Sequence, residues 1–125
     1  MNRDAMIDVV KRSMKYQDDG DVENQLKLYA RDCTFKMPVN HAAMKGVDAL
    51  RESVQRWPKS TTEPEWFAID GNRLVTTWKW RAQAAPAGTP ILRGVSIFVF
   101  NEQGLIQDYE DFFDPDWITR HAAKA

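Results

Sequence analysis

The order of predicted helices and strands indicates an α+β fold. Three segments with helical hydrophobic spacing come first, with one short strand among them, and four alternating apolar segments follow in the second half of the chain. Consecutive strands joined by short turns form an antiparallel meander, and helices that precede such a sheet define the α+β class. The length of 125 residues fits one domain, residues 1–125.

Three helices are predicted in the first half of the chain. Each contains apolar residues three or four positions apart, which places them on one helical face. Gly20 can adopt the left-handed conformation that ends the first helix, and Pro58 closes the third. The predicted helices cover residues 4–19, 22–31 and 47–57.

Five strands are predicted from the alternation of polar and apolar residues. The first ends at Pro38, and we expect it at an edge of the sheet because proline is tolerated there. Residues 39–46 are predicted as a loop, and residues 59–63 as a polar linker. The predicted strands cover residues 32–37, 65–70, 74–83, 91–100 and 105–113, and a short helix at 117–122 follows.

The last strand carries the most informative pattern. Its alternate residues Tyr109, Asp111 and Phe113 share one face, and Asp108 and Glu110 point to the other. One of these sets therefore places a carboxylate on a buried surface. A carboxylate among aromatic side chains costs free energy unless it is paired or used in chemistry, so this strand is where we expect function.

Composition and charge exclude several classes of protein. The 17 basic and 18 acidic residues are nearly balanced, which argues against a nucleic-acid or membrane surface. A single cysteine excludes a disulfide framework, and the two histidines match no metal-ligand spacing. The N-terminus lacks the features of a signal peptide, and no apolar run could span a membrane. We expect a soluble cytoplasmic protein without a metal.

Several short motifs, at residues 18–21, 28–35, 46–50, 103–106 and 111–114, occur in the order found in one known family. With these motifs the chain resembles the nuclear-transport-factor-2-like (NTF2-like) superfamily, and within it the SnoaL-like group of polyketide cyclases, ketosteroid isomerases and limonene epoxide hydrolases. The resemblance implies a cone in which three N-terminal helices pack on a curved, mainly antiparallel sheet around a pocket, and a homodimer through the outer sheet face.

The resemblance can be tested against three catalytic patterns. The tyrosine, carboxylate base and protonated aspartate of ketosteroid isomerases fall on Ser13, Met37 and Ser96, so none of these roles is retained. Asp111 matches an aspartate of both the epoxide hydrolases and the SnoaL cyclases. Lys79 and Arg81 occupy the hydrolase positions of the arginine and the second aspartate.

The resemblance therefore implies Asp111 as an acid–base residue, with Arg81 or Lys79 as its electrostatic partner. A nearby cation would lower the pKa of the carboxyl, or would stabilise an anion formed during the reaction. This requires Lys79 and Arg81 to face the pocket. Hydrophobicity alone favours the reverse orientation, with Trp78 and Trp80 in the core. The other candidate ligand-contacting residues are Tyr109, Phe113, Met37, Trp57, Val95, Arg93, Ser13 and His41.

The implied activity is isomerisation, cyclisation, dehydration or hydrolysis of an apolar cyclic or polyketide-like substrate, without a cofactor. One alternative is a non-catalytic ligand-binding or dimerisation module of the same fold. In that case Asp111 could form a buried ion pair with Arg81 that holds the strands in register.

Overall fold

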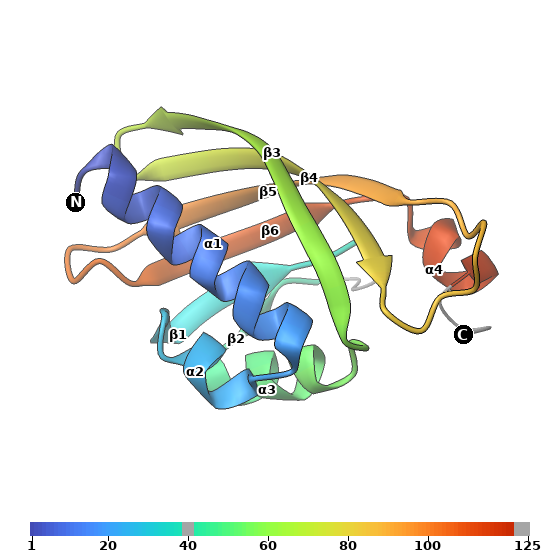
Figure 1. The fold of residues 1–125 in the computed structure, drawn as a ribbon. Helices are drawn as coiled ribbons and strands as arrows, with labels where there is room; N and C mark the ends of the chain where they lie inside the picture. The colour runs from blue at the N-terminus through green and yellow to red at the C-terminus, as the bar shows by residue number, and fades with distance from the viewer. Residues whose placement is uncertain (39–41, 122–125) are drawn as a thin grey trace.

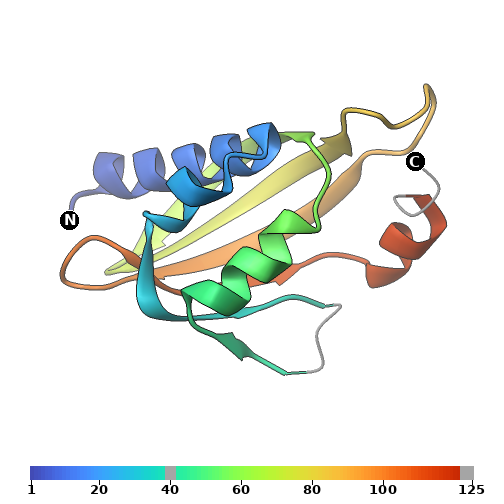
Figure 2. The ribbon, with the colours of Figure 1, turned by 90° about the horizontal axis from the view of Figure 1, so that it is seen from below.

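A computed structural model describes residues 1–38 and 42–121 and contains one curved, six-stranded sheet (Figure 1). Three helices lie along one face of the sheet, and a fourth lies at its C-terminal end (Figures 1 and 2). The helices are α1 (Arg3–Asp19), α2 (Val22–Leu26), α3 (Val47–Gln55) and α4 (Pro115–His121). The strands are β1 (Tyr29–Lys36), β2 (Met44–Lys45), β3 (Ser60–Asp70), β4 (Arg73–Ala82), β5 (Leu92–Phe100) and β6 (Ile106–Phe112).

The strand order is β2-β1-β6-β5-β4-β3. Strands β3 to β6 pair antiparallel in sequence order, which confirms the predicted meander and the α+β class. Strand β1 joins the meander by pairing parallel with β6, so the sheet is mixed. None of the described helices has the length and apolar character that crossing a membrane requires.

The predictions for the segments around the first strand are partly wrong. Strand β1 is not at an edge, because the two-residue strand β2 pairs along its free side, within the segment predicted as a loop. Pro38 follows β1 rather than interrupting it, so its missing N–H group costs the sheet no hydrogen bond. The helix predicted at 22–31 ends at Leu26, since Tyr29 and Ala30 are buried at the start of β1.

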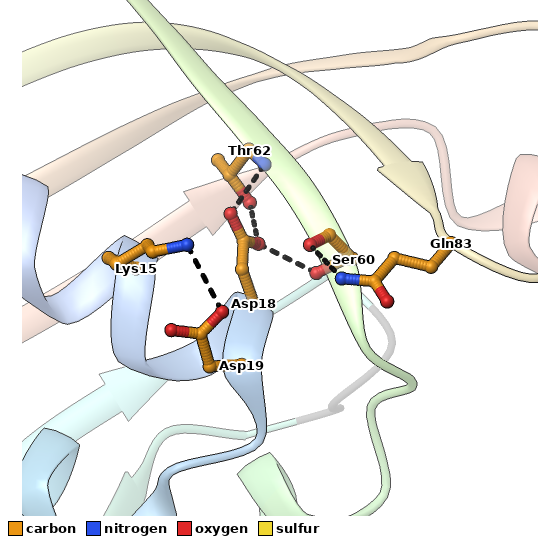
Figure 3. A network of polar contacts seen from close by, with 6 residues as sticks. All are labelled: Lys15, Asp18, Asp19, Ser60, Thr62 and Gln83. Carbon is orange, nitrogen blue, oxygen red and sulfur yellow. Dashed lines mark hydrogen bonds and ion pairs between the residues drawn. The ribbon is translucent and has the colours of Figure 1, made fainter.

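Strand β3 begins at Ser60, so the polar segment 59–63 is not a linker. Ser60 and Thr62 of this segment form hydrogen bonds with Asp18, a buried residue in the last turn of α1 (Figure 3). Asp18 Oδ1 accepts hydrogen bonds from Ser60 Oγ at 2.7 Å and from Thr62 Oγ1 at 2.6 Å. Asp18 Oδ2 accepts the backbone N–H of Thr62 at 2.7 Å. The carboxylate therefore fastens the end of α1 to the start of β3.

Two apolar clusters stabilise the fold. The larger one fills the space between α1, α3 and the sheet, and the smaller one gathers tryptophans near α4. Fully buried members of the first cluster are Met6, Val10, Cys33, Phe35, Leu50, Leu74, Phe100 and Ile106. The second cluster contains Trp78, Trp80, Leu92 and Trp117, with Trp57 and Phe113 packed against it.

Candidate functional site

A pocket lies between α1 and the inner face of the sheet, next to the tryptophan cluster. Its apolar walls include Trp57, Trp78, Trp80, Phe98 and Phe113. Its polar groups belong to Ser13, Gln17, Tyr29, Thr62, Ser96, Tyr109 and Asp111. The cavity is small, with a volume of about 50 Å³. The pocket therefore suits a small or flat ligand.

Asp111 is the carboxylate of this pocket and is only 8% exposed. Its neighbour across the β5–β6 ladder is Ser96, whose hydroxyl donates to Asp111 Oδ1. The hydroxyl of Tyr109, two residues earlier on the same face of β6, donates to Asp111 Oδ2. The indole Nε1 of Trp78 in turn donates to Ser96 Oγ at 2.8 Å. Both carboxylate oxygens thus accept hydroxyl protons from the surrounding sheet.

Burial changes the acidity of these groups. It raises the pKa of Asp111 from 3.8 to about 6, although the hydrogen bonds from Ser96 and Tyr109 act in the opposite direction. Burial, and then the charge of Asp111, raise the pKa of Tyr109 well above its ordinary value. Near neutral pH, Asp111 can therefore exchange a proton, while Tyr109 remains a hydrogen-bond donor.

A second pair of hydroxyls lies on the helix side of the pocket. Ser13 of α1 and Tyr29 of β1 form a hydrogen bond of 2.9 Å, and both line the pocket. Burial raises the pKa of Tyr29, so its hydroxyl also stays protonated. The Tyr29 ring meets the Tyr109 ring edge-on, with 6.1 Å between centroids. Hydroxyl groups therefore line the pocket from both the sheet side and the helix side.

The family model of the SnoaL-like domain matches residues 10–109, which is most of the chain. The chain belongs to the SnoaL-like domain family. This places it in the NTF2-like superfamily, as the motifs predicted. No curated protein matches the chain.

Solved structures place this SnoaL-like domain in the NTF2-like fold. A candidate isomerase from Bacillus subtilis has a TM-score of 0.80 and 16% identity, covering 100% of this chain and 98% of that protein. SalBIII, an epoxide hydrolase/cyclase-like enzyme in pyran ring formation in the polyether salinomycin, has a TM-score of 0.78 and 18% identity. The match covers 92% of this chain and 95% of SalBIII. A candidate ketosteroid isomerase from Kribbella flavida has a TM-score of 0.73 and 15% identity, and the match covers 89% of this chain and 78% of that protein. Such low identities support the fold alone.

Five of the predicted site residues come together in the SnoaL-like domain. Tyr109 and Asp111 on one face of β6, and Phe113 just after it, all line the pocket, in agreement with the shared face that the alternation predicted. Ser13 and Trp57 also line the pocket. All five therefore surround one pocket, and their roles in binding or catalysis stay predictions.

The predicted orientation of β4 is wrong. Trp78 and Trp80 face the pocket and are 7% and 5% exposed, whereas Lys79 is half-buried and Arg81 exposed on the opposite face. Because a strand alternates its faces, burying both indoles turns both cations outward. Apolar burial favours the indoles, and the desolvation cost opposes burying two cations. Asp111 therefore has no ion pair with either cation.

The remaining candidates lie away from the pocket. Arg93 and Val95 lie on the outer face of β5, where Arg93 forms an ion pair with Glu65 at 2.9 Å. Met37 is buried after β1 but does not line the pocket. His41 lies outside the described residues.

Sequence reasoning missed several members of the site. The sequence comparison gives Ser96 only as the position of a lost aspartate, yet Ser96 contacts Asp111 directly. The predicted helix at 22–31 includes Tyr29, and the orientation of β4 that brings Lys79 and Arg81 to the pocket turns Trp78 outward. One signal could have found Ser96, because it alternates with Phe98 and Phe100 on one face of β5. Within the described residues, no three His, Cys, Asp or Glu side chains gather in a way that could hold a metal ion.

Proposed function

We propose that this SnoaL-like protein is an enzyme that performs acid–base chemistry, without a cofactor, on a small apolar cyclic or polyketide-like substrate. Asp111 takes a proton from the substrate, or from water in the case of a hydrolase, and returns it at another atom, as in an isomerase, cyclase, dehydratase or hydrolase. The observation that carries the proposal is a buried carboxyl in an aromatic pocket, with a pKa of about 6. A general base with a pKa near the working pH is most effective.

The pocket also favours a neutral substrate. Among the described residues that line it, Asp111 is an acid and none is Lys, Arg or His. An anionic substrate would meet a buried negative charge without a compensating cation, which is unfavourable at low dielectric. The hydroxyls of Ser13 and Tyr29 can instead donate to a carbonyl or ether oxygen. The proposed reaction class is one that occurs among the similarly folded isomerase-like and cyclase-like proteins.

Ring opening of nitrobenzisoxazole tests the proposed base directly. A base removes the single proton of its C–H group next to nitrogen, the N–O bond breaks, and a coloured nitrophenolate forms. The molecule is neutral and flat, and we expect a saturable rate that rises through pH 6 and then levels off. A rate no greater than that of acetate at equal concentration, or one without this pH dependence, would contradict the proposal.

One observation favours a second function, that of a non-catalytic binding protein. Both oxygens of Asp111 already accept hydroxyls of the protein, so the carboxylate could serve only to organise the pocket. Mass spectrometry of the purified protein would then find a retained small molecule. The same protein would release no nitrophenolate above the background rate.

We also propose that two copies pair through the outer sheet face. The strand pairing aligns Trp66, Thr77, Val95 and Phe112 in one row across β3 to β6. Trp66 and Phe112, the ends of the row, are 51% and 46% exposed. A row that contains a valine and ends in two exposed aromatic rings is typical of an interface between subunits.

Light scattering on the purified protein tests this pairing. We expect the mass of a dimer for the wild type, and of a monomer for Phe112→Lys, because the lysine would bury a charge in the interface. Glu52→Lys, an exposed change on α3, is the control and should stay dimeric. A monomeric wild type at micromolar concentration would refute the proposed interface.

A further inference from the structure

The buried charged groups around the pocket are all of one sign. Asp111 is buried in the pocket wall, and the hydroxyl of Thr62, another lining residue, donates to the buried carboxylate of Asp18 (Figure 3). Within the described residues neither acid forms an ion pair, and no Lys, Arg or His is buried. Two carboxylates therefore lie inside the protein without a cation to balance their charge.

The hydrogen bonds of Asp111 leave it able to take a further partner. A carboxylate oxygen has two lone pairs, and each oxygen of Asp111 accepts one hydroxyl, from Ser96 or from Tyr109. Both oxygens can therefore still face a positive group. The cations expected beside Asp111, Lys79 and Arg81, lie on the opposite face of β4. A cation that pairs with Asp111 would therefore have to come from a ligand.

The aromatic walls of the pocket are of the kind that binds organic cations. The face of an aromatic ring is negative, and a cation within about 6 Å of the ring centre is attracted to it. Trp57 meets Trp80 at 79° and Phe113 at 84°, so these rings stand nearly at right angles and do not stack. Trp78 meets Phe113 at 60°. Rings at such angles can surround a compact charged group on several sides.

The chemistry of the pocket selects among cations. An alkylated ammonium group has methyl groups that aromatic rings can bury, and it requires no hydrogen-bond acceptor. A primary ammonium group has three N–H donors, whose acceptors here would be limited to Asp111 and a few hydroxyl oxygens. The cavity of about 50 Å³ is several times what one water molecule needs, so a group of a few heavy atoms fits. A trimethylammonium group meets these conditions.

We propose that the pocket binds a small organic cation with an alkylated ammonium group, which the rings of Trp57, Trp78 and Trp80 surround and whose charge Asp111 balances. The inference concerns the same pocket as the proposed reaction but does not depend on catalysis. The negative charge that disfavours an anionic substrate favours this cation, which competes with the neutral substrate. In a non-catalytic protein, the cation is the retained ligand.

Choline and its neutral analogue, in which a tert-butyl group replaces trimethylammonium, form a matched pair of probes. They have the same shape, and only choline is charged. Isothermal titration calorimetry at about pH 8, where Asp111 is ionised, compares their dissociation constants. We expect choline to bind about 10- to 100-fold more tightly, because the rings and the carboxylate both attract it. Equal affinities, tighter binding of the analogue, or no binding of choline at millimolar concentration would overturn the proposal.

Asp111→Asn tests the contribution of the carboxylate charge. The variant keeps the size of the side chain and should reduce the preference for choline over the analogue by about 10-fold. Asp108→Asn is the matched control, because it removes the same charge from the other face of β6 and should leave the preference unchanged. A preference that survives in Asp111→Asn, or that falls equally in Asp108→Asn, would overturn the pairing with Asp111.

Trp80→Leu tests the contribution of the rings. Leucine keeps the wall apolar but has no negative face, so choline should lose about 3- to 10-fold in affinity and the neutral analogue less. Equal losses for the two probes would overturn the role of the rings.

Change in ring-opening kinetics separates this proposal from the proposed function. Choline should raise the KM for nitrobenzisoxazole without lowering kcat, since both occupy one pocket. An unchanged KM at saturating choline would place choline elsewhere and overturn the proposal. Absence of ring opening in the wild type would contradict the proposed function, while calorimetry would still decide whether the pocket binds the cation.

Discussion

Asp111→Asn should slow the ring opening of nitrobenzisoxazole by about 10²- to 10⁴-fold, the usual contribution of a general base. Asparagine keeps the size of the side chain but cannot accept the substrate's proton. The comparison is made on kcat/KM, with stopped-flow or steady-state absorbance. Asp108→Asn is the matched control, because Asp108 lies on the same strand and points to the other face. An equal loss in both variants would rule out a specific role for Asp111.

The same substitution should also make the protein more stable at neutral pH. The folded-state pKa of Asp111 is about 6, above its ordinary value of 3.8. Between these values the folded state binds more protons than the unfolded state, so the free energy of unfolding falls as pH rises. Asp111→Asn removes this dependence, and we expect a gain on the order of 1–3 kcal/mol at pH 7. Urea unfolding of both proteins across this pH range measures it.

A stability gain together with a loss of activity would identify a residue kept for chemistry at the expense of the fold. Unchanged activity with altered stability would favour the binding protein instead. A loss of stability at neutral pH would mean that the hydroxyls of Ser96 and Tyr109 compensate fully for burying the charge.

Asp18→Ala should lower the free energy of unfolding by about 3–5 kcal/mol. The substitution leaves Ser60 Oγ and the N–H group of Thr62 buried without their acceptor, and it releases α1 from β3 (Figure 3). Each unsatisfied buried donor costs about 1–3 kcal/mol. Chemical denaturation measures the loss, with the m-value as a check on two-state unfolding.

Asp19→Ala is the matched control for this prediction. Asp19 is the next residue of α1, but it is exposed and forms an ion pair with Lys15 at 3.2 Å. Exposed pairs of this kind contribute little, so we expect a change within about 0.5 kcal/mol. Similar losses in the two variants would show that the buried carboxylate does not hold α1 on the sheet.

Local sequence patterns were sufficient to predict the fold class and which residues of the last strand share a face. Strand alternation is set by covalent geometry, so Tyr109, Asp111 and Phe113 had to share a face wherever β6 packed. Helix spacing and the glycine at position 20 similarly predicted α1, which ends at Gly20 with a φ of 73°. These features depend on neighbours within a few residues.

The choice between the two faces of β4 could not be made in the same way. Both alternations are regular, one offering Trp78 and Trp80 and the other Lys79 and Arg81 to the pocket. The likeness to catalytic positions in the family favoured the cations, and the burial of the indoles decided against them. The polar start of β3 also lacked a local signal, because its acceptor Asp18 is 42 residues away from Ser60.

The chain's own order of apolar and polar residues determined an α+β protein with a carboxyl among aromatic groups on its last strand. Only the packed structure decided that this carboxyl meets Ser96, Tyr109 and, through Ser96, Trp78 rather than a cation. The reason is that strand pairing joins residues 15 to 18 positions apart in a register set by the burial of whole side chains. No periodicity within one strand contains that information.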